Sequence, residues 1–163
     1  MTNRKILISV IGGHDSSDKV EKLAHNVGKI IAKMDAHVVC GGLYGVMEAV
    51  ARGAKEAGGT TIGLIPGKTK SDANPYIDIV IATTIGYARN AMVACSADII
   101  VALPGSHGTL SEICYGFVYD KPIIDMGNWN RPGMIKVKGL KGLESKLKQL
   151  IPRVKVKETS TED

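Results

Sequence analysis

The feature that most constrains the fold is a regular alternation of short apolar runs with longer amphipathic stretches. The apolar runs fall at residues 5–11, 37–40, 60–65, 76–82, 98–103 and 122–126, and several of them stop at glycines. Runs of this length that are apolar on both faces are typical of strands buried in a parallel sheet. The alternation therefore predicts six strands separated by helices and loops.

The segment after the first glycines has the clearest helical pattern. From Val20 to Met34, apolar residues recur at the i, i+3, i+4, i+7 spacing of one helix face. Asp18, with Glu21 three residues on, is the predicted N-cap pair. Further helices are predicted at 45–57, at 87–96, from Thr109 onward, and at 140–151, where leucines mark a last amphipathic helix.

This order of strands and helices predicts an α/β fold. We expect a single Rossmann-like domain with a doubly wound, mostly parallel sheet of about six strands. The length of 163 residues matches one domain of ordinary size. Residues 1–157 are assigned to this domain, and residues 158–163 are expected to form a disordered tail.

Positive charge is concentrated near the C-terminus. Residues 1–130 balance 12 Lys or Arg against 12 Asp or Glu, whereas residues 131–157 contain nine Lys or Arg and Glu144 alone. Such a segment could bind nucleic acid, but it has few aromatic residues to stack on bases, so a solvated helix face is the favoured interpretation. Nucleic acid is therefore the less favoured partner.

The cysteines indicate a cytoplasmic protein. Cys40, Cys95 and Cys114 are odd in number and scattered, as expected of reduced thiols. The apolar run at 6–11 is too short to cross a membrane, and the chain has no signal-peptide pattern. No paired ligands at short spacing predict a metal site, and neither a Walker loop nor a dinucleotide fingerprint is present. We expect no metal, no resident cofactor such as NAD, and no membrane partner.

Three glycine-rich turns carry the functional prediction, at 12–14, 41–45 and 104–109, each directly after a predicted strand. Each alone could be an ordinary connection, because glycine is the default residue where φ is positive. Ligands of open α/β sheets bind beyond the carboxyl ends of the strands, so three turns at that edge favour a ligand crevice. The predicted ligand-binding residues are Gly12, Gly13, His14, Gly41, Gly42, Gly45, Gly105, Ser106, His107, Gly108 and Thr109.

The turn at 104–109 has the strongest signal, because it joins a strand to a helix start. Backbone N–H groups at a helix N-terminus form an anion site, and Ser106 and Thr109 add hydroxyl donors. Glu112 has two interpretations: the last residue of a capping box that begins at Thr109, or a carboxylate that overlooks the anion site. Arg89 is either a surface charge or a clamp on a phosphate.

On these residues the chain resembles the LOG family of phosphoribohydrolases, which release cytokinin bases from nucleoside 5′-monophosphates. Residues 104–112, Pro-Gly-Ser-His-Gly-Thr-Leu-Ser-Glu, are similar to the family signature P-G-G-x-G-T-x-x-E. Residues 41–47 match a second block, G-G-x-x-G-(L/V)-M, and Arg89 matches a family arginine. The chain is also similar to the wider SLOG superfamily, which includes the DNA-processing protein DprA.

The resemblance implies that Arg89 and Glu112 are the catalytic pair of an N-glycosidic hydrolysis and that the protein is a homodimer. Asp125, at the end of the sixth predicted strand, is a candidate for a second carboxylate. Two positions depart from the enzymes: Ser106 replaces the second signature glycine, and Asn90 stands where lysine usually follows the arginine. The short chain is closer to a branch once labelled lysine-decarboxylase-like, which includes molybdenum cofactor carriers. No convincing site for a pyridoxal Schiff base supports the decarboxylase label.

Three hypotheses for function remain open at this point. The first is a nucleoside 5′-monophosphate phosphoribohydrolase. The second is a carrier or sensor that binds a phosphorylated, nucleotide-like small molecule, such as molybdenum cofactor, without converting it. The third is a nucleic-acid-associated protein that acts through residues 131–157.

Overall fold

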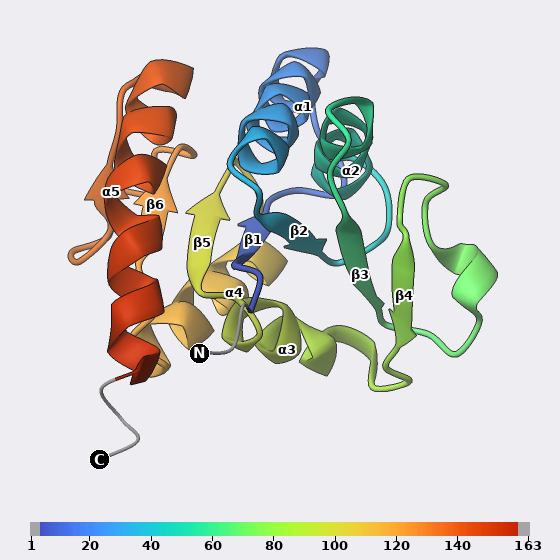
Figure 1. The fold of residues 1–163 in the computed structure, drawn as a ribbon. Coiled ribbons are helices and arrows are strands. Elements are labelled where there is room, and N and C mark those ends of the chain that lie inside the picture. The colour runs from blue at the N-terminus through green and yellow to red at the C-terminus, as the bar shows by residue number, and fades with distance from the viewer. Residues whose placement is uncertain (1–3, 160–163) are drawn as a thin grey trace.

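The computed structural model describes residues 4–159, which form one sheet covered by helices on both faces (Figure 1). All paired strands are parallel, in the order β4-β3-β2-β1-β5-β6-β7. The strands are β1 (Leu7–Ile11), β2 (His37–Cys40), β3 (Thr61–Ile65), β4 (Ile79–Ala82), β5 (Ile99–Ala102), β6 (Ile123–Asp125) and β7 (Ile135–Lys136). The predicted fold class is confirmed. The prediction misses only β7, because two residues are too few to show a pattern.

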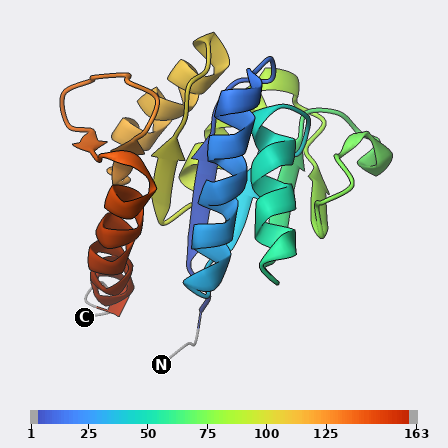
Figure 2. The ribbon, with the colours of Figure 1, turned by 90° about the horizontal axis from the view of Figure 1, so that it is seen from above.

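The described residues also form five α-helices and two short 3-10 helices, of which α5 follows the last strand. They are α1 (Asp18–Lys33), α2 (Val46–Glu56), η1 (Lys70–Asp72), η2 (Gly86–Ala88), α3 (Arg89–Cys95), α4 (His107–Val118) and α5 (Gly139–Thr159). Helices α1, α2 and α5 cover one face of the sheet, while α3 and α4 cover the other (Figures 1 and 2). Helix α5 continues past residue 158, where the tail was expected to begin, and residues 160–163 lie outside the described residues.

The start of α1 differs from the prediction by one residue. Ser17, not Asp18, is the N-cap, and its hydroxyl accepts a hydrogen bond from the N–H of Val20 at 3.4 Å. Glu21, the predicted capping partner of Asp18, instead accepts a hydrogen bond from the hydroxyl of Ser16 at 3.0 Å. The buried stripe of the helix follows the predicted 3.6-residue period.

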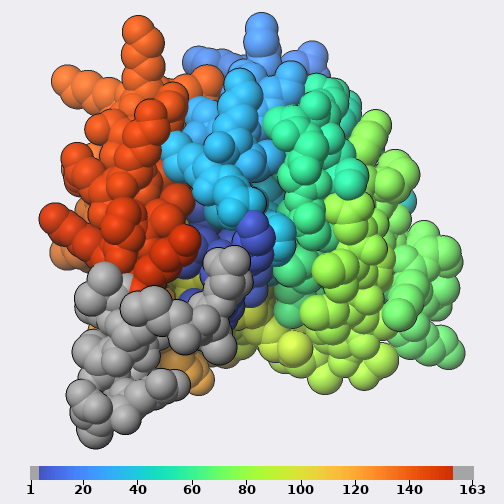
Figure 3. All heavy atoms as spheres, viewed as in Figure 1, coloured from blue at the N-terminus to red at the C-terminus, as the bar shows by residue number. Residues whose placement is uncertain are grey.

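Alternate residues along the strands pack into two separate hydrophobic cores, one on each face of the sheet. In β5, Val101 packs in the core beneath α1, α2 and α5, whereas Ile100 and Ala102 pack in the core beneath α3 and α4. Burial of a side chain such as Ile100 contributes about 1.5–3 kcal/mol. In the space-filling view α5 lies along the side of the molecule beside α1 (Figure 3).

The two faces are not covered equally. Only the seven residues of α3 and the twelve of α4 cover the second face, and edge strand β4 leaves Ile79 at 49% and Ile81 at 41% exposure. This side of the molecule keeps an apolar surface. Within residues 4–159, no helix has both the length and the apolar character that a membrane crossing requires.

Candidate ligand-binding pocket

The three predicted glycine turns meet at the edge of the sheet where the carboxyl ends of the strands lie. The strand order reverses between β1 and β5, which are neighbours in the sheet although β2, β3 and β4 lie between them in sequence. At this position the N–H of Gly13 donates to the carbonyl of Pro104 at 2.9 Å. The N–H of Val46, at the start of α2, donates to the Gly13 carbonyl at 3.1 Å. The turns therefore meet as predicted, at the switch point where open α/β sheets bind their ligands.

Two of the glycines are required by this close approach. Gly45 has a φ of +65°, and a Cβ there would lie 2.1 Å from the His14 carbonyl oxygen. At Gly105 a Cβ would lie 2.1 Å from Thr109 Oγ1 and 2.9 Å from the Gly13 nitrogen. Both positions serve the packing of one turn on the next, so their glycines are explained without a ligand.

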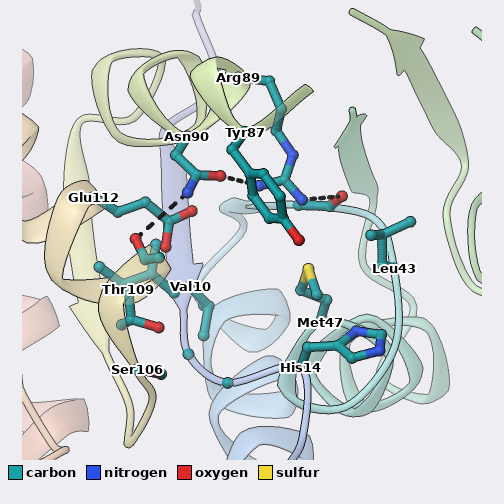
Figure 4. Close-up of a pocket in the computed structure, with 15 residues that line it drawn as sticks. Val10, His14, Leu43, Met47, Tyr87, Arg89, Asn90, Ser106, Thr109 and Glu112 are labelled. Carbon is teal, nitrogen blue, oxygen red and sulfur yellow. Dashed lines mark hydrogen bonds between the residues drawn. The ribbon is translucent and has the colours of Figure 1, made fainter. Parts of the chain in front are cut away.

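The turns surround a pocket of about 430 Å³, a volume within the range of small-molecule sites (Figure 4). It is lined by Val10, Ile11, Gly12, Gly13, His14, Gly41, Leu43, Met47, Tyr87, Arg89, Asn90, Ser106, Gly108, Thr109 and Glu112. A second hollow, of about 380 Å³, lies between the loops that follow β1 and β5. It shares Gly13, His14 and Ser106 with the first.

Arg89, the first residue of α3, brings a buried positive charge to the pocket. It is 6% exposed, its Nη1 donates to Asn90 Oδ1, and its Nη2 donates to the Gly41 carbonyl at 3.3 Å. Among the described residues, Nε has no hydrogen-bond partner and no carboxylate forms an ion pair with the guanidinium. Burial lowers the pKa of Arg89, and the negative charge of Glu112 partly opposes that shift.

Helix α4 begins at His107, two residues earlier than predicted, with Ser106 as its N-cap. In the described structure Ser106 makes no side-chain cap hydrogen bond, and its hydroxyl lies 3.4 Å from His107 Nδ1. The N–H groups of a first helical turn have no partner within the helix and carry the positive end of its dipole. This end of the pocket therefore suits an anion.

Glu112 does not take the position of a capping-box glutamate, because the helix starts too early for Thr109 to be the N-cap. It lies in the second turn of α4, is 6% exposed, and lines the pocket. Burial raises the pKa of Glu112 to about 8, and the nearby charge of Arg89 partly offsets this rise. At neutral pH the carboxyl group is mostly protonated and can donate a hydrogen bond.

The wall opposite the α4 terminus is largely apolar. Leu43 and Met47 come from the second glycine turn and the start of α2, and Tyr87 stands before α3 at the pocket mouth (Figure 4). Tyr87 is 87% exposed. The ring of His14 meets Tyr44 edge to face, with centroids 6.2 Å apart. A flat ring could lie between these side chains.

Most of the residues predicted to bind the ligand line this pocket, together with Arg89 and Glu112. Gly105 lines only the second hollow, and Gly42, Gly45 and His107 line neither. The prediction misses Val10, Ile11, Leu43, Met47, Tyr87 and Asn90. Signals for three of these were present in the sequence, since Leu43 and Met47 lie within the second glycine block and Asn90 follows Arg89 directly.

Asp125 is not a second pocket carboxylate. Its two oxygens accept hydrogen bonds from the backbone N–H groups of Gly127, Trp129 and Asn130 at 2.9–3.1 Å. The side chain therefore organises the loop after β6. Of the described residues that line the main pocket, Glu112 is the only carboxylic acid.

Fold and site together define a Rossmann-like α/β protein with a ligand-sized pocket and a buried arginine at its switch point. The chain belongs to the SLOG cluster4 family, whose model matches residues 5–158. This confirms the predicted membership of the LOG and SLOG group.

Two solved structures of molybdenum cofactor proteins are similar to this chain. The molybdenum cofactor binding protein from Rippkaea orientalis has a TM-score of 0.85 and 31% identity, over 92% of this chain and 99% of that one. The Moco carrier protein from Chlamydomonas reinhardtii has a TM-score of 0.82 and 31% identity, over the same shares.

A curated enzyme is also related. The cytokinin riboside 5′-monophosphate phosphoribohydrolase of Mycobacterium tuberculosis is 33% identical over 117 residues, which cover 66% of this chain. The alignment spans 63% of that enzyme's own length, so this chain corresponds to less than two thirds of it.

Proposed function

We propose that this protein binds the phosphate monoester of a nucleotide-like small molecule in the main pocket, with the phosphate between the first turn of α4 and Arg89. The observation that carries the proposal is the buried guanidinium, whose Nε lacks a hydrogen-bond partner and which, among the described residues, has no ion-pair partner. An anionic ligand would supply the missing countercharge. Hydrogen bonds to charged groups each contribute about 1.5–3 kcal/mol.

The rest of the ligand would lie toward the apolar wall. Leu43, Met47 and Tyr87 offer a surface for a flat heterocycle, and a nucleoside 5′-monophosphate and the phosphorylated pterin of molybdenum cofactor both combine such a ring with a phosphate monoester. The shared chemistry explains how one family can include both kinds of relative.

Between the two relatives, we infer a carrier that binds its ligand without turnover. Ordinary glycosidases use two carboxyl groups that flank the bond they cleave, whereas Glu112 is the only acid among the described residues that line the main pocket. The molybdenum cofactor proteins also match this chain almost from end to end. The test is mass spectrometry of small molecules that co-purify with the native protein: an intact phosphorylated heterocycle supports the carrier, and free ribose phosphate contradicts it.

Phosphoribohydrolysis is the second candidate, and the protonated state of Glu112 favours it. A buried acid with a pKa of about 8 could protonate a departing base near neutral pH, while Arg89 holds the phosphate. Incubation with AMP and related monophosphates would then release free base, and Glu112→Ala would abolish the release while Glu48→Ala on α2 would not. Absence of free base with every monophosphate tested would exclude this candidate.

We further propose that the protein is a homodimer that buries the apolar surface on the side of α3 and α4. Exposed apolar residues there include Ile79 and Ile81 of β4, Met92 of α3, Tyr115, Phe117 and Val118 of α4, and Tyr119 just after it. Apolar surface of this kind is typical of interfaces. Sedimentation equilibrium should give twice the chain mass for the wild type and the monomer mass for Val118→Glu with Ile81→Glu; a monomeric wild type contradicts the dimer.

Two expectations from the sequence remain proposals. A cytoplasmic location is supported by Cys40, Cys95 and Cys114, which are all free thiols. Nucleic-acid binding would use the exposed lysines of α5, among them Lys141, Lys148 and Lys155. Retention on DNA-cellulose at low salt would support it, and passage of the protein without retention would exclude it.

A further inference from the structure

The amide of Asn90 connects the two halves of the proposed anion site. Asn90 is the second residue of α3 and is 5% exposed. Its Oδ1 accepts a hydrogen bond from Arg89 Nη1. On the other side its Nδ2 donates to the Gly108 carbonyl at 3.5 Å (Figure 4). The same Nδ2 donates to Ser111 Oγ at 3.2 Å, and both partners lie in the first turns of α4.

The chemistry of the two partners fixes the orientation of this amide. A guanidinium only donates hydrogen bonds, so the oxygen of the amide must face Arg89 and its NH₂ must face α4. The hydroxyl of Ser111 donates in turn to the Gly108 carbonyl at 2.6 Å, which leaves its oxygen free to accept from Asn90. The Asn90 side chain therefore holds the Arg89 guanidinium in a fixed position relative to the start of α4.

The amide does this without adding a charge. The second partner of Arg89 is the carbonyl of Gly41, which is also neutral. A carboxylate at position 90 would keep the acceptor but would pair with Arg89, so that a ligand anion would compete with a permanent internal one. With two neutral acceptors, the full positive charge of the guanidinium stays available to the ligand.

We propose that Asn90 is a positioning residue that aligns Arg89 with the first turn of α4 and, by staying neutral, selects ligands that end in a dianionic phosphate monoester. This inference rests on the proposed binding of a phosphate monoester. A monoester carries up to two charges and a diester carries one, so removal of one positive charge from the site weakens the monoester more.

The test uses AMP and cyclic AMP as probes, because they share base and sugar but differ in phosphate charge. Affinities would be measured by titration calorimetry for the wild type, Asn90→Asp and Asn90→Ala. Asn26→Asp on α1 makes the same change of charge away from the pocket and is the matched control. We expect the wild type to bind AMP more tightly than cyclic AMP. The ratio of the two affinities should fall at least about tenfold in Asn90→Asp and stay unchanged in Asn26→Asp.

Asn90→Ala removes the bridge without adding a charge, so AMP affinity should fall by about three- to tenfold. Thermal unfolding identifies any variant that fails to fold, and Asn90→Ser takes the place of Asn90→Ala if that variant does not fold. If Asn90→Asp keeps the wild-type preference for AMP over cyclic AMP, the inference is overturned, because a merely structural role would weaken both ligands alike. Unchanged AMP affinity in Asn90→Ala would overturn it too. If the wild type binds neither AMP nor inorganic phosphate, the proposed function fails first and the role of Asn90 fails with it.

Discussion

Arg89 and Glu112 both line the main pocket, each 6% exposed, and within the described chain their charges interact without a direct ion pair. Desolvation by burial outweighs the attraction between the two charges. The pKa of Glu112 therefore rises to about 8, and the pKa of Arg89 falls. At neutral pH the pair therefore keeps one net positive charge. The net positive charge of the pair favours an anionic ligand.

The raised pKa of Glu112 predicts that the protein loses stability as pH rises. The carboxyl titrates near 4.5 when unfolded and near 8 when folded, so the unfolded state loses its proton first. This contribution to the free energy of unfolding is complete below about pH 4.5 and is lost progressively up to about pH 8. Urea denaturation at pH 5, 7 and 9 should show a decline that Glu112→Gln lacks and Glu48→Gln retains; parallel curves for the wild type and Glu112→Gln would contradict it.

The same ionisation predicts how ligand affinity depends on pH. Deprotonation of Glu112 above about pH 8 places a negative charge beside the bound phosphate, so the affinity for AMP should fall there. Calorimetric titrations at pH 7.5 and pH 9 should show weaker binding at the higher pH for the wild type. Glu112→Gln should bind equally at both values, and an equal fall in that variant would show that another group is responsible.

Arg89→Met is expected to make the protein more stable but to weaken its binding of AMP. Arg89 is a buried charge without an ion-pair partner among the described residues, and its replacement by an apolar chain removes a desolvation cost. The thermal midpoint should rise, while the affinity for AMP should fall at least about tenfold. Arg52→Met on α2 is the control for both measurements. A lower midpoint together with unchanged AMP affinity would mean that Arg89 is structural.

Two glycines with positive φ allow the contact between turns to be measured. Gly45 and Gly58 have φ values of +65° and +77°, but a Cβ at Gly45 meets the His14 carbonyl at 2.1 Å, whereas a Cβ at Gly58 meets nothing within 4 Å. Gly58→Ala should lose about 1 kcal/mol to backbone strain. Gly45→Ala should lose about 1–3 kcal/mol to strain, because its φ of +65° and ψ of −127° suit glycine alone, and a further 1–3 kcal/mol, roughly, to overpacking. Chemical denaturation of both proteins measures the difference, and equal losses would refute the contact.

Local pattern was enough to predict the fold. The 3.6-residue period between Val20 and Met34 and the apolar runs on both sides of the glycine turns specify elements that depend on near neighbours in sequence. Errors occurred where a choice between adjacent residues depends on geometry. Ser17 caps α1 in place of Asp18, and α4 starts at His107 instead of near Thr109. That earlier start excludes the capping box, which was one of the two interpretations of Glu112.

The site was predictable only in part, for the same reason. Glycine turns at strand ends indicate an anion site, and the resemblance pointed to Arg89 and Glu112. On the apolar wall, Tyr87 joins Leu43 and Met47 from a separate segment of the chain, and no local pattern reveals that contact. Asn90 carried a signal only as a departure from the family pattern, because its role depends on contacts with α4 that lie 18 and 21 residues away.

The most direct test of the central claim is a crystal structure of the protein grown with AMP. We expect the phosphate at the first turn of α4, with Arg89 nitrogens at hydrogen-bond distances of about 2.7–3.2 Å and the adenine against Tyr87. A phosphate bound elsewhere, or a main pocket that stays empty at saturating AMP, would contradict it.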